Sequence, residues 1–273
     1  METGLKGKVV IVTGGASNIG KGIVLAFAKE GSKIAIVDID EAQGQKVAVK
    51  ARQLGAEGTL VVRTDVTSID AVENMVKVVL KEFGTIDVLV NNVGWPSDKP
   101  LIEETKEILD KEIALNLRST INCTRAVLPH MIQMSKGSVV NLGSEAGRIG
   151  DPSRVIYSAC KGGVIALTKA IARDVGRHGI TVNCVCPDTI MPGDFEEDIG
   201  EGSIFHPTKG QYGLNMRSLP KSMEVLQAAL AGHAIARLGT PSEIGPAVVF
   251  LASEAASYIT GQSLSINGGN AMI

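Results

Sequence analysis

The stretch that decides the fold reads Lys8-Val9-Val10-Ile11-Val12-Thr13-Gly14-Gly15-Ala16-Ser17-Asn18-Ile19-Gly20. A β-branched run ends at Thr13, passes through a glycine-rich turn and enters an apolar segment that reaches Glu30. A strand, a glycine turn and a helix N-terminus together make an anion site, because the unpaired N–H groups of the first helical turn face the turn. The stretch therefore predicts the first βα unit of a nucleotide-binding fold.

The same order of strand, loop, amphipathic helix and glycine recurs along the first two-thirds of the chain. Predicted helices end at Gly31, Gly55, Gly84 and Gly179, each just before a β-branched run. Such alternation requires crossover connections and hence a parallel sheet. We predict an α/β fold of the Rossmann type: one doubly wound, parallel, seven-stranded sheet with helices on both faces. The predicted strands are Lys8–Thr13, Lys33–Asp38, Thr59–Arg63, Val88–Asn91, Ser138–Leu142, Ile180–Cys186 and Ser263–Ile266.

The length of 273 residues and the absence of a low-complexity linker predict one domain over residues 1–273. A helix is predicted from Ile69 to Phe83, with Thr67 and Asp70 as its capping pair. One irregular stretch begins at Pro187, where glycine, proline and charged residues interrupt any periodicity. Long loops inside a compact domain are usually functional, so we expect a substrate lid at about residues 188–235.

Composition excludes several classes of function. Twenty-seven basic and 29 acidic residues give a net charge of −2, which favours neither a nucleic acid nor an anionic membrane as partner. Neither a secretory leader nor an apolar run of about 20 residues is visible. The cysteines form no C-x-x-C pair and do not sit at metal-ligand spacing with the histidines, so we expect free thiols, no metal site and a cytoplasmic location. These cysteines are Cys123, Cys160, Cys184 and Cys186.

An acidic residue ends the second predicted strand. Asp38 follows Ile34–Val37, and a carboxylate there accepts both ribose hydroxyls of an adenosine and repels a 2′-phosphate. Ile39 and Ser17 occupy the nearby positions where a cation would hold that phosphate. The sequence therefore predicts NAD rather than NADP as cofactor.

At this point the chain resembles the short-chain dehydrogenase/reductase family over nearly its whole length. The turn Thr13–Gly20 is similar to T-G-x-x-x-G-x-G, with Asn18 in place of the middle glycine. Asn tolerates a positive φ better than other non-glycine residues, so we expect a left-handed Asn18. Tyr157-Ser158-Ala159-Cys160-Lys161 reproduces Y-x-x-x-K, and Asn91-Asn92-Val93-Gly94 resembles N-N-A-G. Asp188 departs from the family pattern, which has glycine after Pro187.

The resemblance implies a catalytic set and a cofactor set. Tyr157 would be the acid/base, Lys161 would favour its phenolate and hold the nicotinamide ribose, and Ser144 would bind the substrate oxygen. Asn116 would hold a water that relays the proton. The implied cofactor-binding residues are Gly14, Ser17, Asn18, Ile19, Gly20, Asp38, Asp65, Val66, Asn92, Gly94, Tyr157, Lys161, Pro187 and Thr189.

We expect an oxidoreductase that interconverts a secondary alcohol and a ketone, assembled as a homotetramer by family resemblance. Two alternatives stay open: a non-catalytic subunit of the same fold, and a reductase of 3-oxoacyl thioesters. Short blocks, Asn92–Trp95 and Ala146–Arg148, resemble bacterial dehydrogenases acting on 2-hydroxycyclohexanecarboxyl-CoA. Arg148 and Arg154 lie before Tyr157, and Lys209, Arg217 and Lys221 lie in or beside the presumed lid. Together with these blocks, they predict an anionic substrate, such as a cyclic hydroxyacyl-CoA.

Overall fold

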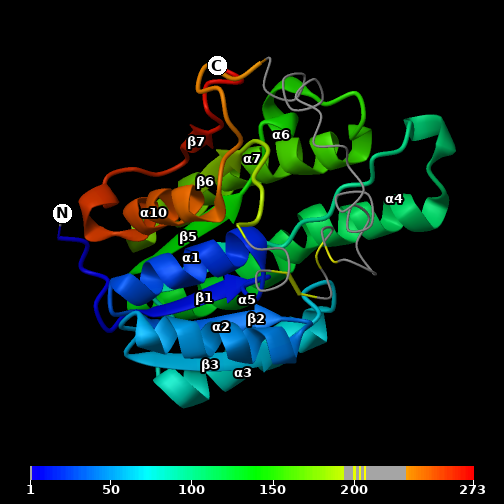
Figure 1. Cartoon of the computed structure of the whole chain (residues 1–273). Coiled ribbons are helices and arrows are strands. Elements are labelled where there is room, and N and C mark those ends of the chain that lie inside the picture. The colour runs from blue at the N-terminus through cyan, green and yellow to red at the C-terminus, as the bar shows by residue number, and fades with distance from the viewer. Residues whose placement is uncertain (1, 194–198, 201–202, 204–205, 207–231) are drawn as a thin grey trace.

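The computed structural model describes residues 2–193, 199–200, 203, 206 and 232–273. Within these residues, seven strands form one parallel sheet in the order β3-β2-β1-β4-β5-β6-β7 (Figure 1). The predicted fold class is confirmed. The strands are β1 (Val9–Thr13), β2 (Lys33–Asp38), β3 (Gly58–Arg63), β4 (Val88–Asn91), β5 (Gly137–Leu142), β6 (Ile180–Pro187) and β7 (Ser263–Ile266).

Helices cover both faces of this sheet. The helices α1, α2 and α10 pack on one face, and α3, α5 and α7 pack on the other (Figure 1). Two short helices, α4 and α6, lie beside the pocket described below. The bounds are α1 (Asn18–Lys29), α2 (Glu41–Gln53), α3 (Ile69–Phe83), α4 (Lys106–Ile113), α5 (Ser119–Met134), α6 (Ala146–Ile149), α7 (Val155–Val175) and α10 (Pro241–Ala252).

The strands are apolar throughout because each faces two cores. In β1, Val10 and Val12 enter the core under α1, whereas Val9 and Ile11 enter the core under α3 and α5. Side chains alternate across a strand, so a strand buried on both faces reads as a continuous apolar run. This is why the strand positions were predictable.

The chain reverses its direction of travel across the sheet after β3. As a result β1 pairs with both β2 and β4, each in parallel. Crossovers on the two sides of this point leave by opposite faces and open a crevice at the carboxyl ends of the strands, where ligands bind in doubly wound folds.

One predicted helix cap is wrong by one residue. Ser68, not Thr67, is the N-cap of α3, and its Oγ accepts the N–H of Ala71. Thr67 instead donates its hydroxyl to Asp65 Oδ1 at 2.6 Å. Its backbone N–H also donates to Asp65 Oδ1, at 2.9 Å, so Thr67 belongs to the turn that precedes the cap.

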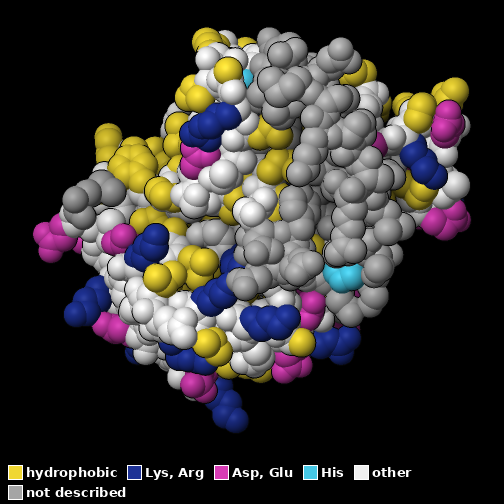
Figure 2. All heavy atoms as spheres, in the orientation of Figure 1, with side chains coloured by type: hydrophobic (Ala, Val, Ile, Leu, Met, Phe, Trp, Pro, Cys, Tyr) yellow, Lys and Arg dark blue, Asp and Glu magenta, His cyan; other side chains and the backbone are white. Residues whose placement is uncertain are grey.

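Among the described residues, one helical stretch, Val155–His178, is long and apolar enough to cross a membrane by length and composition alone. Its residues Ala172 and Val175 pack into the core of the sheet. Only 28% of its apolar window is buried, so the stretch keeps an apolar surface outside the fold. On the face shown in Figure 2, Lys and Arg side chains lie among Asp and Glu side chains rather than in a separate area.

Candidate active site

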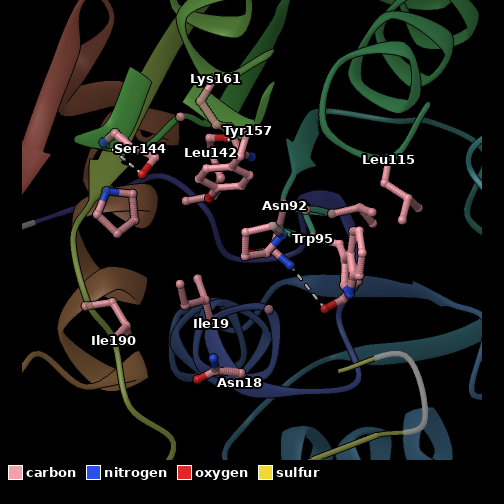
Figure 3. Close-up of a pocket in the computed structure, with 18 of the residues that line it drawn as sticks. Asn18, Ile19, Asn92, Trp95, Leu115, Leu142, Ser144, Tyr157, Lys161 and Ile190 are labelled. Atoms are coloured by element: carbon pink, nitrogen blue, oxygen red, sulfur yellow. Dashed lines mark hydrogen bonds between the residues drawn. The ribbon is translucent and has the colours of Figure 1, made fainter. Parts of the chain in front are cut away.

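A cavity of about 780 Å³ lies at the carboxyl ends of the strands. Figure 3 shows Leu142, Ser144, Tyr157 and Lys161 grouped at one end, with Asn18 and Ile19 at the opposite end. Trp95 and Leu115 form a side wall between them. The cavity falls within the range of about 300–1,000 Å³ that is usual for cofactor and substrate pockets.

The glycine turn after β1 forms one end of this cavity. Asn18 has a φ of 43°, as predicted, and Gly14 has a φ of 62°. A Cβ on Gly20 would lie 1.9 Å from the Gly14 carbonyl oxygen, so only glycine allows this close approach. Asn92 Nδ2 fixes the turn by donating to the carbonyls of Thr13 and Gly14 at 3.0 and 3.1 Å.

The helix end beside this turn offers hydrogen-bonding groups to a ligand. The side chain of the N-cap residue Ser17 makes no bond to the first-turn N–H groups of α1. The Asn18 Oδ1 atom is buried and accepts no hydrogen bond. Open N–H groups at a helix N-terminus suit a phosphate, so this turn fits the pyrophosphate of a dinucleotide.

Asp38 stands at the end of β2 with its carboxylate held by two backbone groups. Oδ2 accepts the N–H of Ala16 at 3.0 Å, and Oδ1 accepts the N–H of Asp40 at 3.1 Å. Burial raises the pKa of the Asp38 carboxyl above its ordinary value, and these two hydrogen bonds oppose the rise. The neighbouring cation Arg63 directs Nε to the Ile39 carbonyl at 3.3 Å and is not part of the cavity wall. Asp38 is thus an anchored carboxyl on the wall of the cavity.

The opposite end brings together Ser144, Tyr157 and Lys161. Lys161 is only 2% exposed, and its Nζ donates to the Leu142 carbonyl at 2.8 Å. The same Nζ lies 5.5 Å from the centroid of the Tyr157 ring. The Ser144 Oγ accepts the N–H of Ala146 at 3.2 Å, which leaves the hydroxyl hydrogen for another acceptor.

Asn116 does not line the cavity. It is fully buried in a π-helical turn, Ala114–Arg118, between α4 and α5. Its Oδ1 accepts the Trp95 N–H at 2.8 Å, and its Nδ2 donates to the carbonyls of Trp95 (2.7 Å) and Glu112 (2.9 Å). Its side chain therefore holds the Trp95 backbone from behind the wall.

A small space beside Gly94 connects Asn116 to the cavity. Asn116 Oδ1 and Lys161 Nζ each lie 3.1 Å from the point that a Cβ on Gly94 would occupy. A lone pair of Oδ1 and two N–H groups of Lys161 are not used by the bonds described above. An acceptor and a donor thus border the same space, which suits a bridging water.

Asp188 turns toward the C-terminal segment. Its Oδ2 lies 2.9 Å from His233 Nε2 and accepts from Asn270 Nδ2 at 2.6 Å. The His233 side chain is 6% exposed. The aspartate that replaces the family's glycine therefore ties the residues after β6 to two positions near the end of the chain.

The two arginines predicted at the substrate mouth differ in position. Arg148 is absent from the cavity wall; its guanidinium donates to Ser265 Oγ and, at 2.7 Å, to the Ile273 carbonyl. The prediction that Arg148 meets the substrate is wrong, because the short helix α6 turns it toward β7. Arg154 does line the cavity, with its Nε 2.6 Å from Asp98 Oδ1.

All fourteen predicted cofactor-binding residues lie on the cavity wall. Most of the predicted lid, together with Lys209, Arg217 and Lys221, lies outside the described residues. The cavity also has residues that the sequence analysis did not single out for the site. Trp95, the only tryptophan, directly follows the N-N-A-G-like segment, and this position was a signal that it belongs to the site. No sequence pattern marks Lys111, Leu115 or Asn270 as site residues.

Comparison with known proteins gives matches over most of the chain. A family model described as short chain dehydrogenase matches residues 8–202, and one described as Enoyl-(Acyl carrier protein) reductase matches residues 213–271. L-fucose dehydrogenase from Bos taurus is 37% identical over 270 residues, covering 98% of this chain and 91% of that protein. The 3-oxoacyl-[acyl-carrier-protein] reductase of Chlamydia muridarum is 36% identical over 271 residues (99% and 100%), and that of Thermotoga maritima is 35% identical over 265 residues (97% and 98%).

Proposed function

Because the chain belongs to the short-chain dehydrogenase/reductase family, we propose that it is an NAD-dependent enzyme that interconverts a secondary alcohol and a ketone. One observation carries the proposal: Ser144, Tyr157 and Lys161 meet at one end of a cavity that has Asp38 at its other end. The cavity thus joins an acid/base group to an adenosine-binding carboxyl, as hydride transfer to or from a dinucleotide requires.

Each residue of the catalytic end has a definite task in this reaction. The Lys161 ammonium, fixed by the Leu142 carbonyl, favours the phenolate of Tyr157, which then takes the proton of the alcohol. Ser144 donates its hydroxyl hydrogen to the substrate oxygen. A nicotinamide held beside these residues by Lys161 would supply the hydride chemistry at the carbinol carbon.

The proton leaves by way of Lys161 and the space beside Gly94. Two donors of Lys161 remain for the nicotinamide ribose and for a water in that space. Asn116 Oδ1 would accept from this water, which keeps the relay role of Asn116 while its amide holds Trp95.

Asp38 supports NAD as the cofactor. Its carboxyl is held in place by Ala16 and Asp40 and needs no rearrangement to accept two ribose hydroxyls. Arg63, which pairs with Asp38 at the end of the adjacent strand β3, donates its Nε–H to a backbone carbonyl. A 2′-phosphate would therefore meet a carboxyl rather than a guanidinium.

For the substrate we propose a cyclic hydroxy compound, with a cyclic hydroxyacyl-CoA as one candidate. Trp95 supplies an aromatic wall for a ring, and Lys111 Nζ lies 3.9 Å above the Trp95 ring centroid on the same wall. Lys111 takes over the role of an anion-binding cation that Arg148 does not fill. The relative named L-fucose dehydrogenase makes a sugar the second candidate.

A reductase of 3-oxoacyl thioesters is the second candidate function, favoured by the two 3-oxoacyl-[acyl-carrier-protein] reductases among the relatives. The discriminating experiment follows nicotinamide absorbance with purified protein. Cyclohexanol, L-fucose and a cyclic hydroxyacyl-CoA are tested with NAD and NADP, and a 3-oxoacyl-CoA with NADH and NADPH. We expect the highest kcat/KM for an alcohol with NAD. Faster reduction of the 3-oxoacyl-CoA with NADPH would favour the second function, and NAD binding without turnover would favour a non-catalytic subunit.

We further propose a cytoplasmic homotetramer. The four cysteines are free thiols, as a reducing compartment favours. On the outer side of α5 and α7, an apolar hollow of about 260 Å³ is lined by Ile121, Leu128, Ile132, Leu167 and Ile171, among others. A second copy that covers this hollow would bury the apolar surface of α7. Light scattering should give four times the chain mass, and Leu167→Glu should lower it.

A further inference from the structure

A carboxyl outside the catalytic set lies buried behind the wall of the cavity. Glu112, in the last turn of α4, is 0% exposed, and its Oε1 accepts the N–H of Ser97 at 2.8 Å. Its Oε2 is buried and meets no donor. An ionised carboxylate can only accept hydrogen bonds, and a buried carboxylate oxygen without a donor costs free energy. The Oε2 oxygen of Glu112 therefore needs a proton, either its own or one shared with a neighbour.

A second carboxyl supplies the partner. Glu104 lies close enough to Glu112 for its charge to act on the Glu112 carboxyl. The Glu104 Oε2 is also buried without a donor. Two ionised carboxylates cannot bond to each other, whereas one proton between them satisfies both oxygens. The two residues therefore form a pair that shares a proton.

The pair is connected to the cavity through the loop Trp95–Ser97. Asn116 holds both backbone groups of Trp95. Glu112, one helical turn earlier, holds the next N–H of the loop, that of Ser97, because Pro96 has none. The Glu112 carbonyl in turn accepts from Asn116 Nδ2. Trp95 and Pro96 line the cavity. A movement of the Glu112 side chain therefore displaces this loop, and with it the wall that faces the substrate.

We propose that Glu112 is a positioning residue, which holds the Trp95 loop through a proton shared with Glu104 and makes substrate binding depend on pH. The proposal rests on the proposed function only for its kinetic readout. With the proton in place, the pair closes the loop on α4. When Glu112 ionises, its repulsion from Glu104 separates the two side chains and loosens the wall formed by Trp95.

The acidic groups facing Glu112 act in the same direction as burial. Burial, first, raises the pKa of Glu112 to about 7, and the charges of Glu104 and Asp98 add to the rise, which the Ser97 N–H opposes. Asp98 directly follows this loop and pairs with Arg154. From α7, the Cys160 thiol senses the charge of Glu112. The change in protonation of Glu112 therefore falls within the pH range in which most enzymes are assayed.

The first test uses the fluorescence of Trp95, the only tryptophan, because it needs no substrate. We titrate the wild type, Glu112→Gln and the control Glu107→Gln, an exposed carboxyl on the same helix, from pH 5.5 to 8.5. Wild type and control should show one transition near pH 7. Glu112→Gln should keep the pH 5.5 spectrum throughout, because its amide accepts from Ser97 and donates to Glu104 without titrating. A transition that persists in Glu112→Gln, or none in the wild type, overturns the proposal.

Glu104→Gln is the second variant. Its amide donates to the Glu112 carboxylate and replaces the shared proton, so the transition should shift to lower pH by at least one pH unit. An unchanged midpoint would exclude Glu104 as the partner and overturn the pair.

The kinetic readout separates positioning from catalysis. In the wild type, KM for the alcohol should rise severalfold between pH 6 and 8, and in Glu112→Gln it should stay at its low-pH value while kcat keeps the wild-type pH profile. A kcat profile altered in Glu112→Gln, with KM unaffected, would contradict a positioning role. If no alcohol is turned over, the proposed function fails while the fluorescence result still decides the inference about Glu112.

Discussion

Replacement of Asp38 by asparagine should reverse much of the preference for NAD. The charge is lost, while one side-chain oxygen remains to accept the N–H of Ala16, which is fully buried and would cost about 1–3 kcal/mol if left unpaired. Asp38→Asn is therefore a better test than Asp38→Ala, which also frees the glycine turn from its anchor.

The size of the effect follows from the two cofactors separately. A hydrogen bond to a charged acceptor contributes about 1.5–3 kcal/mol, so loss of the Asp38 charge should lower kcat/KM for NAD by about 10- to 150-fold. Two like charges about 5 Å apart at an effective dielectric constant of about 20 repel by about 3 kcal/mol, and this repulsion of the 2′-phosphate is relieved. The NAD/NADP ratio should fall by at least about 100-fold.

The assay compares kcat/KM for NAD and NADP at saturating alcohol in the wild type, Asp38→Asn and Asp40→Asn. Asp40 is the matched control, because its Oδ1 caps α2 by accepting the Gln43 N–H, a bond that asparagine preserves. The control should keep the wild-type ratio. A wild type that uses both cofactors equally, or an equal change in both variants, would refute the assignment of Asp38.

Three further predictions address the acid/base, the buried carboxyl and the C-terminal tie. Tyr157→Phe should abolish turnover with NAD binding preserved, whereas Lys161→Ala should impair both; substantial turnover in Tyr157→Phe, measured by absorbance, would mean that another group is the base. The pKa of Glu112 is about 7 in the folded state against 4.5 ordinarily, so its contribution to stability is complete below pH 4.5 and is lost as pH rises to 7. Urea unfolding should therefore show that Glu112→Gln gains stability over the wild type between pH 5 and 8, by up to about 3 kcal/mol at about 1.36 kcal/mol per pH unit, and a constant difference would contradict this. Asp188→Ala should leave His233 and Asn270 unpaired and lower the unfolding free energy by about 1–3 kcal/mol; an unchanged melting temperature would exclude the tie.

The sequence predicted the sheet well because the signal for a strand buried on both faces is local. The ranges Lys33–Asp38 and Val88–Asn91 are the same in prediction and structure, since β-branched runs between glycine and charged residues leave few alternatives. The left-handed Asn18 was predictable for the same reason, because its conformation depends on the turn that contains it.

What the sequence could not supply are contacts between distant segments. Nothing near Arg148 indicates that it reaches the Ile273 carbonyl, and nothing near Asp188 indicates a bond to Asn270, 82 positions later. The π-helical turn at Asn116 likewise follows from packing between α4, α5 and the Trp95 loop rather than from helix propensity. These positions depend on tertiary structure, which residue types alone do not encode.

The pairing of β1 with β4 also governs how the chain is made. Val10 pairs with Val88, 78 positions later, and β2 and β3 are synthesised in between. At about 5–20 residues per second, translation leaves that side of β1 without a neighbour for about 4–16 s. Its apolar surface and open backbone groups are exposed during this time, so the nascent chain is a candidate for chaperone binding. Refolding from denaturant should be slow for its size for the same reason, since β1 and β4 must close a long loop before they gain a hydrogen bond to each other.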